Sequence, residues 1–277
     1  MGYFRPHNLP QALDWLAETR GGIVAGCTDV FAATTAPTLT GPQLDVTAIE
    51  DIRGIAETGD HWRIGAATRW ADIAGADLPP AFDGLKCASR QIGSIQIQNA
   101  GTIGGNLCNA SPAADGVPPL LTLEAGVELA SRAGTRTLPL SKFLLGPRRT
   151  AKATDEILTA ILVPKPAARG RSVFLKLGTR KYLVISIAMV AARMTVTDGA
   201  VEDIAIAVGA CSAVATRLPR LEAVLTGKKA GPGLGTFITA ELVGGQLSPI
   251  DDMRADAAYR RQVAAELVAR AVTGLAP

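Results

Sequence analysis

Residues that commonly build metal centres are scarce in this 277-residue sequence. Its four cysteines stand far apart and form no C-x-x-C pair, which argues against a zinc ribbon or an iron–sulfur cluster held by this chain. The two histidines, His7 and His61, lie apart from any cluster of carboxylates. We therefore predict no metal site in this chain, and four reduced thiols of the kind found in cytoplasmic proteins.

The common nucleotide-binding motifs are absent as well. No G-x-x-x-x-G-K-[ST] occurs, which argues against a P-loop NTPase, and no G-x-G-x-x-G opens a strand-to-helix turn. The nearest segment, GPGLG at residues 231–235, has the wrong spacing and is expected to be a helix connector. The formal net charge is only +3, and no stripe of lysine and arginine alternates with aromatic residues, so no nucleic-acid partner is expected.

Long apolar runs are missing too. The longest, residues 183–192, has about half the length that a membrane-spanning helix needs, so no membrane insertion is expected. The first ten residues, MGYFRPHNLP, contain no apolar signal core, and a cytoplasmic protein is predicted. Because 48% of the residues are apolar and 19% are charged, we expect a large buried core, in one large domain or in two or three smaller ones.

What the sequence does contain is an unusual stretch, residues 92–123, in which glycines and small polar residues gather between two apolar segments. The residues in question are Asn99, Gly101, Thr102, Gly104, Gly105, Asn106, Asn109, Ser111 and Asp115. Glycine is favoured where the backbone turns tightly or approaches another group closely, and exposed backbone N–H groups in such a loop bind phosphate. We interpret the stretch as a dinucleotide-binding loop whose side chains supply further polar partners.

A second loop of similar character lies upstream, at residues 22–33 (GIVAGCTDVFAA). A short β-branched run predicts a strand, and the apolar residues after Asp29 predict a helix. Thr28 or Asp29 could cap that helix, or the backbone amides could face a diphosphate at its N-terminus. Either loop alone is more simply an ordinary turn. Together they predict one pyrophosphate held from two sides by main-chain groups.

The remaining elements are predicted from apolar periodicity and from proline and glycine positions. Residues 1–57 are expected to contain a helix over 10–18, a strand, a helix and a strand over 43–47. For residues 58–168 we expect a strand at 62–64, a helix at 69–74, the glycine-rich loop, and strands near 127–130 and 156–163. The predicted elements of residues 169–277 are strands at 172–177, 187–196 and 201–208, and helices at 218–225, 235–244 and 256–273.

Several motifs then occur in a fixed order: VAGCTD at 24–29, WRIGAAT at 62–68, IGS at 92–94, TIGGN at 102–106 and ASPAAD at 110–115. In these motifs the chain resembles the FAD-binding medium subunits of molybdenum hydroxylases, the group that contains xanthine dehydrogenase and carbon monoxide dehydrogenase. The resemblance covers essentially the whole chain, and the T-I-G-G-N and A-S-P-x-x-D pair is its most specific signal. It implies an α+β, vanillyl-alcohol-oxidase-like FAD-binding fold of two subdomains, followed by a smaller C-terminal α+β domain.

The resemblance also implies how FAD would bind. Residues 25–29 and 102–106 would hold the diphosphate, and Asp115 would bond ribityl or ribose hydroxyls, with Ser111 supporting the turn. Leu158 would lie against the isoalloxazine, and Lys176 close to the polar edge of that ring would favour an anionic reduced flavin; without the family, Lys176 would be interpreted as a solvated strand lysine. The predicted cofactor-binding residues are Val24, Ala25, Gly26, Cys27, Thr28, Asp29, Val30, Ile92, Thr102, Ile103, Gly104, Gly105, Asn106, Ser111, Asp115, Leu158 and Lys176.

Three residues depart from the family pattern. The family usually has glycine where this chain has Cys27, and many relatives carry arginine where it has Gln98. Some relatives have an aspartate where Val184 precedes Ile185 and Ser186. The diphosphate loop is expected to tolerate all three, and a bulky residue at Gly104 or Gly105 is expected to abolish FAD retention.

The function that the resemblance implies is electron transfer. FAD in this chain would receive electrons from two 2Fe-2S clusters of a small partner subunit and pass them to an acceptor such as NAD. A molybdenum cofactor in a large partner subunit would oxidise the substrate, in a dimer of heterotrimers. No catalytic acid or base is predicted here. Two alternatives stay open: a self-contained flavoprotein oxidase or reductase, and a scaffold subunit whose flavin site has decayed, which Cys27 and Val184 prompt.

Overall fold

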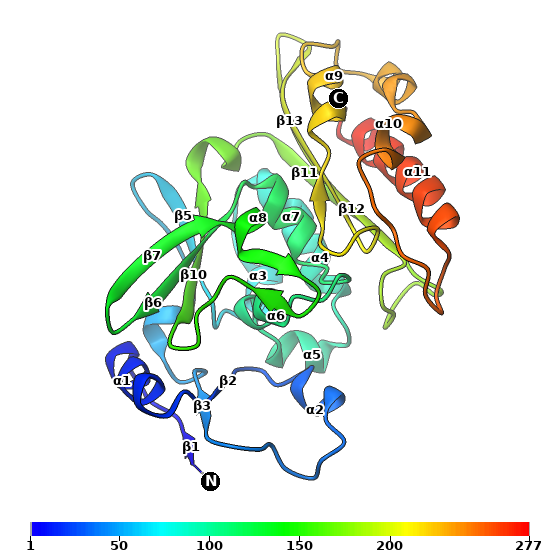
Figure 1. The fold of residues 1–277 in the computed structure, drawn as a ribbon. Helices are drawn as coiled ribbons and strands as arrows, with labels where there is room; N and C mark the ends of the chain where they lie inside the picture. The colour runs from blue at the N-terminus through cyan, green and yellow to red at the C-terminus, as the bar shows by residue number, and fades with distance from the viewer. Residues whose placement is uncertain (1, 277) are drawn as a thin grey trace.

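The structure, a computed structural model, describes residues 2–276 and contains three main sheets (Figure 1). The first is parallel and has the order β1-β3-β2, with β1 at Tyr3–Phe4, β2 at Gly22–Val24 and β3 at Gln43–Asp45. Helix α1 (Leu9–Thr19) buries Ala12 and Leu16 against Leu44 in this part of the chain. The remaining elements here are α2 (Val30–Ala33) and the 3-10 helix η1 (Glu50–Ile52).

The second sheet is antiparallel and has five strands in the order β4-β5-β10-β6-β7. Its strands are β4 (Ile55–Glu57), β5 (His61–Gly65), β6 (Gly126–Ser131), β7 (Gly134–Pro139) and β10 (Ile157–Pro164). The helices of this region are α3 (Trp70–Gly75), η2 (Pro80–Phe82), α4 (Asp83–Gln91), α5 (Ile95–Ala100), α6 (Ile103–Asn109), α7 (Val117–Thr122) and α8 (Leu140–Phe143). A short hairpin, β8 (Leu144–Gly146) and β9 (Arg149–Thr150), follows α8.

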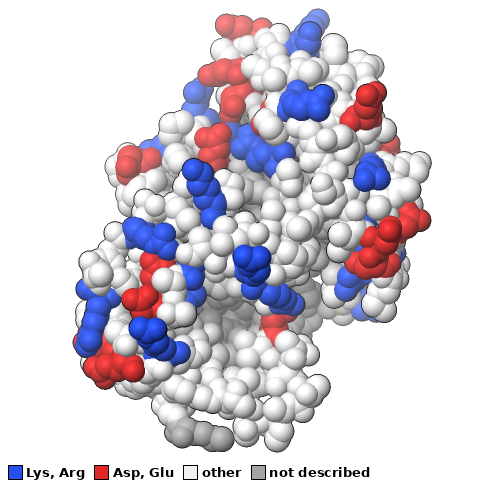
Figure 2. All heavy atoms as spheres, in the orientation of Figure 1, with Lys and Arg blue, Asp and Glu red and all other residues white. Residues whose placement is uncertain are grey.

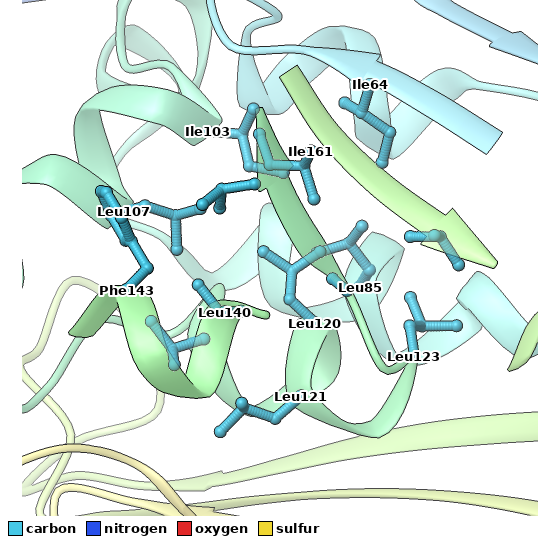
Figure 3. Packing of buried hydrophobic residues seen from close by; sticks show 14 of the residues in the cluster. Ile64, Leu85, Ile103, Leu107, Leu120, Leu121, Leu123, Leu140, Phe143 and Ile161 are labelled. Atoms are coloured by element: carbon cyan, nitrogen blue, oxygen red, sulfur yellow. The ribbon is translucent and has the colours of Figure 1, made fainter. Parts of the chain in front are cut away.

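The core of this region lies between the sheet and its helices. Figure 3 shows Ile64 and Ile161 of the sheet, Ile103 and Leu107 of α6, and Phe143 of α8 among the residues that pack together there. All five are fully buried. This packing fixes the first turn of α6, where the T-I-G-G-N motif lies.

The third sheet is antiparallel, in the order β11-β12-β13-β14, and lies beside the second (Figure 1). Its strands are β11 (Arg171–Leu177), β12 (Ala188–Thr197), β13 (Ala200–Gly209) and β14 (Thr216–Arg217), and η3 (Lys165–Ala168) leads into it. The helices that follow are α9 (Pro219–Leu225), η4 (Pro232–Phe237), α10 (Ala240–Gly244) and α11 (Ala257–Leu275). Helix α11 packs on β12, which buries Val268 and Val272.

Two predictions about secondary structure are wrong. The stretch read as one glycine-rich loop contains the short helices α5, α6 and α7, because Ser94 and Thr102 each cap a new turn with a side-chain oxygen. The single helix expected over residues 235–244 is two pieces, η4 and α10. Thr239 separates them, since its hydroxyl accepts a hydrogen bond from the N–H of Leu242 and starts a new helix.

None of the helices within residues 2–276 is long and apolar enough to cross a membrane. In the same residues, no group of three or more His, Cys, Asp or Glu side chains is placed to hold a metal ion.

Candidate functional site

A cleft of about 1070 Å³ is lined by residues from the regions of all three sheets. Its volume lies just above the range of roughly 300–1,000 Å³ that is usual for small-molecule sites. In Figure 2 the middle of the displayed face is recessed, and lysine and arginine side chains border the recess. The cleft is therefore large enough for an extended ligand such as a dinucleotide.

The cleft brings together residues that are distant in the sequence. All the predicted cofactor-binding residues line it except Ile103. The side chain of Ile103 is instead fully buried in the core beside Leu107 and Ile64 (Figure 3), so this side chain does not face the cleft as predicted. The reason is helix geometry, because α6 turns its first residue toward the sheet and its third toward the cleft.

The segment from Gly26 to Asp29 lies between β2 and α2 and lines the cleft. Within residues 2–276, no group accepts a hydrogen bond from the backbone N–H of Gly26, Cys27, Thr28 or Asp29. Asp29 takes the cap position of α2 but its side chain makes no capping hydrogen bond. The alternative that a side chain caps this helix is therefore wrong, and four successive N–H groups are left to bind an anion.

This segment packs directly against the end of α5. A Cβ atom added to Gly26 would overlap the carbonyl oxygen of Ala100 and lie 2.9 Å from the Cα of Gly101. One added to Gly101 would lie 3.4 Å from the hydroxyl of Thr28. The two predicted cofactor loops therefore meet along their backbones.

The second loop differs from its prediction. Its backbone N–H groups are already paired: Ile103 donates to the carbonyl of Thr68, Gly104 to that of Ala66, and Gly105 to the Thr102 hydroxyl. The idea of two main-chain cradles with free N–H groups is therefore wrong for residues 103–105. What this loop offers the cleft is open space and the side chain of the next residue, Asn106.

Two observations define that contribution. A Cβ atom at Gly105 would meet only the Thr102 hydroxyl, at 3.0 Å, so the missing side chain leaves room on the cleft side of α6. The Oδ1 atom of Asn106 is buried, and no hydrogen-bond partner lies near it among the described residues. An unpaired buried acceptor is costly, so the Oδ1 atom of Asn106 is a strained point of the structure at the edge of the cleft.

Gly104 has a different role from its neighbour. A Cβ atom there would lie 2.7 Å from both the Cβ and the carbonyl oxygen of Ala66, inside the protein. Gly104 therefore serves packing, and a bulky residue there would act on the fold and not by direct contact with the cofactor.

Asp115 and Lys176 form a buried ion pair in the cleft wall. The Lys176 Nζ atom lies 2.5 Å from Asp115 Oδ2, and the hydroxyl of Ser186 donates to Asp115 Oδ1 at 2.6 Å. Burial raises the pKa of the Asp115 carboxyl, while the ion pair and the two hydrogen bonds act in the opposite direction with smaller effect. The interpretation of Lys176 as a solvated strand lysine is wrong, and both oxygens of Asp115 already have partners.

Ser111 and Leu158 occupy supporting positions in the cleft. The Ser111 hydroxyl accepts a hydrogen bond from the N–H of Ala113, which stabilises the turn before α7. Leu158 is 5% exposed and lies next to an irregularity in the pairing of β10 with β6. Such a bulge redirects side chains, and here the strand supplies Ile157 and Leu158 to the apolar wall of the cleft.

Most of the charged residues that line the cleft were not among the predicted site residues. The basic residues along the cleft outnumber the acidic ones by three: Arg20, Arg148, Lys152, Lys176, Arg254 and Arg260 against Asp29, Asp115 and Asp252. This balance favours an anionic ligand. The charged residues come from separate parts of the chain, so no single local pattern marks them together. The uncharged lining residue Ser186 was missed as well, although it lies two positions after Val184, to which the family pattern drew attention.

Cys27 is in the left-handed backbone region, with φ of 55°. A side chain is disfavoured there, and glycine relieves the strain. We expect Cys27→Gly to raise the free energy of unfolding by about 1 kcal/mol, since relief of strain exceeds the entropy that glycine adds to the unfolded chain. Chemical denaturation checks this, and Cys27→Val, with a branched side chain, should lower the stability instead. A destabilised glycine variant would contradict the argument.

Comparisons with known proteins identify the family of the chain. Residues 1–166 match the family model described as the FAD binding domain in molybdopterin dehydrogenase, and residues 174–275 match the CO dehydrogenase flavoprotein C-terminal domain. The chain is 34% identical over 196 residues to the nicotinate dehydrogenase FAD-subunit of Eubacterium barkeri, a match that covers 67% of this chain and 65% of that protein.

Two further similarities extend over nearly the whole chain. The nicotine 6-hydroxylase medium subunit of Paenarthrobacter nicotinovorans is 29% identical, over 98% of this chain and 95% of its own length. In a solved structure of carbon monoxide dehydrogenase from Hydrogenophaga pseudoflava, which lacks the Mo-pyranopterin moiety of the molybdenum cofactor, one chain superposes with a TM-score of 0.90. That match has 27% sequence identity and covers 99% of this chain and 96% of the other.

Proposed function

The chain belongs to the family of FAD-binding medium subunits of molybdenum hydroxylases, and on that premise we propose that it is the electron-transfer subunit of such an enzyme. In this proposal FAD in the cleft receives electrons from 2Fe-2S clusters of a small partner subunit and delivers them to an external acceptor such as NAD. A large partner subunit carries the molybdenum cofactor, and the assembly is a dimer of heterotrimers. The chain itself divides at residues 57 and 168 into two FAD-binding subdomains and a C-terminal domain.

The observation that carries the proposal is the row of unpaired backbone N–H groups from Gly26 to Asp29 in a cleft with excess positive charge. A diphosphate fits such a row, because each N–H group donates to a negatively charged oxygen. The Asn106 amide, on a residue that lines the cleft, is of the kind that exchanges hydrogen bonds with ribose and ribityl hydroxyls. The residues present are therefore suited to FAD in charge, in size and in hydrogen bonding.

Each part of the cleft has a physical role in this function. FAD, when bound, supplies the chemistry that joins one-electron clusters to a two-electron acceptor. The Gly26–Asp29 backbone fixes the position of the ligand, and Asn106 selects its polar groups. Ile157 and Leu158 exclude water from the apolar wall. No residue of the chain needs to act as a general acid or base.

The first test is the colour of the purified protein. We expect the full chain to be yellow and to release about one flavin per chain on denaturation, because the cleft offers one extended anionic site. In its native source it should co-purify with iron–sulfur and molybdenum subunits. A colourless protein that takes up no FAD would support the scaffold alternative, and turnover of an organic substrate by the chain alone would support the self-contained oxidase or reductase.

A further inference from the structure

Three buried side chains from separate elements form one hydrogen-bonded unit in the cleft wall. Asp115 precedes α7, Lys176 lies in β11, and Ser186 lies just before β12. The side chains of Lys176 and Asp115 are 6% and 7% exposed, and Ser186 is 2% exposed. All three line the cleft. We call this unit the Asp115–Lys176–Ser186 triad.

Within the triad the charge of the lysine is balanced. One carboxylate oxygen of Asp115 lies 2.5 Å from Lys176 Nζ and the other accepts the hydrogen bond from Ser186. The carboxylate is held from both sides and is fixed in orientation. It in turn fixes the ammonium, whose only other hydrogen bond in the described part of the chain is a long one of 3.5 Å to the carbonyl of Gln91.

The balance of charge matters because the triad is buried. An unpaired ammonium in such a wall attracts negative charge on a ligand strongly, since the effective dielectric constant is far below that of water. A carboxylate in direct contact offsets most of that attraction. Reduction adds negative charge to a flavin, so an unpaired ammonium would stabilise the reduced form more than the oxidised one and would raise the reduction potential.

We propose that Asp115 and Ser186 are positioning residues, which hold Lys176 in a charge-balanced pair and keep the reduction potential of bound FAD below the value that an unpaired ammonium would give. This inference rests on the proposed function, because it requires FAD in the cleft. It reverses the simpler expectation that Lys176 acts as a free positive charge toward the reduced flavin.

The test uses the full chain loaded with FAD, with the midpoint potential and the FAD dissociation constant as separate readouts. Asp115→Asn keeps the size of the side chain and removes its charge. We expect the midpoint potential to rise by ~30 mV for a two-electron couple. This corresponds to about tenfold tighter binding of the reduced flavin relative to the oxidised flavin. Ser186→Ala should raise the potential by a smaller amount, because the Asp115 carboxylate loses the hydrogen bond from Ser186 but keeps its contact with Lys176.

The double variant Asp115→Asn with Lys176→Gln supplies the decisive comparison. It removes both charges, so its potential should return close to that of the wild type. A matched control is Asp203→Asn, which removes the carboxylate 2.7 Å from the buried Arg193 guanidinium, away from the cleft lining. This control should leave the potential unchanged.

A purely structural role for the triad makes a different prediction. The three residues join the region of the second sheet to that of the third, so a structural clamp would lower the melting temperature of each variant and leave the potential alone. An unchanged potential in FAD-loaded Asp115→Asn would overturn the proposal. If that variant fails to hold FAD, an unchanged potential in Ser186→Ala overturns it instead. Failure of the wild-type chain to bind FAD would refute the proposed function itself.

Discussion

Gly26→Ala is expected to abolish flavin retention and to destabilise the fold around the cleft. The added Cβ atom would overlap the carbonyl oxygen of Ala100 and would lie 2.9 Å from the Cα of Gly101, and both are backbone atoms that cannot rotate away. The Gly26–Asp29 segment would have to move off α5, which would displace the four N–H groups that are proposed to bind the diphosphate. Overpacking of this kind costs about 1–3 kcal/mol. Flavin absorbance of the purified protein and thermal unfolding measure the two effects separately.

The control for this variant is Gly59→Ala. Gly59 lies between β4 and β5, outside the cleft, and nothing lies within 4 Å of the position that its Cβ atom would take. The same chemical change should therefore leave both flavin content and melting temperature close to those of the wild type. Full flavin occupancy in Gly26→Ala would show that the close approach of the two loops is unnecessary for binding.

The parts of the fold that the sequence predicts well are those with strong local patterns. Strands such as β11, β12 and β13 are continuous apolar or alternating runs, and α11 has a capping aspartate, Asp256, at its start. The family and the α+β fold class are confirmed, because the motifs around the Gly26–Asp29 segment and α6 are specific and occur in order. The division into domains and the roles of individual site residues stay predictions.

The errors have a common physical origin in tertiary pairing. Glycine-rich stretches look like loops in isolation, yet the N–H groups of Ile103 and Gly104 find acceptors on residues 66–68, about 35 positions earlier in the chain. The inward turn of Ile103 and the partnership of Asp115 with Ser186 depend on the same kind of long-range contact. Local patterns carry no information on which distant strand will supply a partner, so these features needed the structure.

Gly105→Val is expected to weaken FAD binding by roughly tenfold to a hundredfold while the protein stays folded. The position is exposed on the cleft side of α6, and the added Cβ atom would meet only the Thr102 hydroxyl, at 3.0 Å. The branched side chain would therefore fill space beside Asn106 that the ligand needs. Its own N–H group keeps its bond to Thr102, so the expected loss comes from the volume of the side chain and not from a lost phosphate contact. Titration of the flavin-free protein with FAD measures it.

Valine substitutions at two other glycines, Gly233 and Gly104, are the controls for Gly105→Val. Gly233→Val places the same side chain in η4, where nothing lies within 4 Å of the added Cβ atom, and FAD affinity should be unchanged. Gly104→Val drives its side chain into Ala66 and should unfold the region around α6. This variant should therefore lower the melting temperature even when no FAD is present. If Gly105→Val bound FAD as tightly as the wild type, the ligand would not reach α6. The site would then have to be confined to the Gly26–Asp29 segment and the part of the cleft that contains the Asp115–Lys176–Ser186 triad.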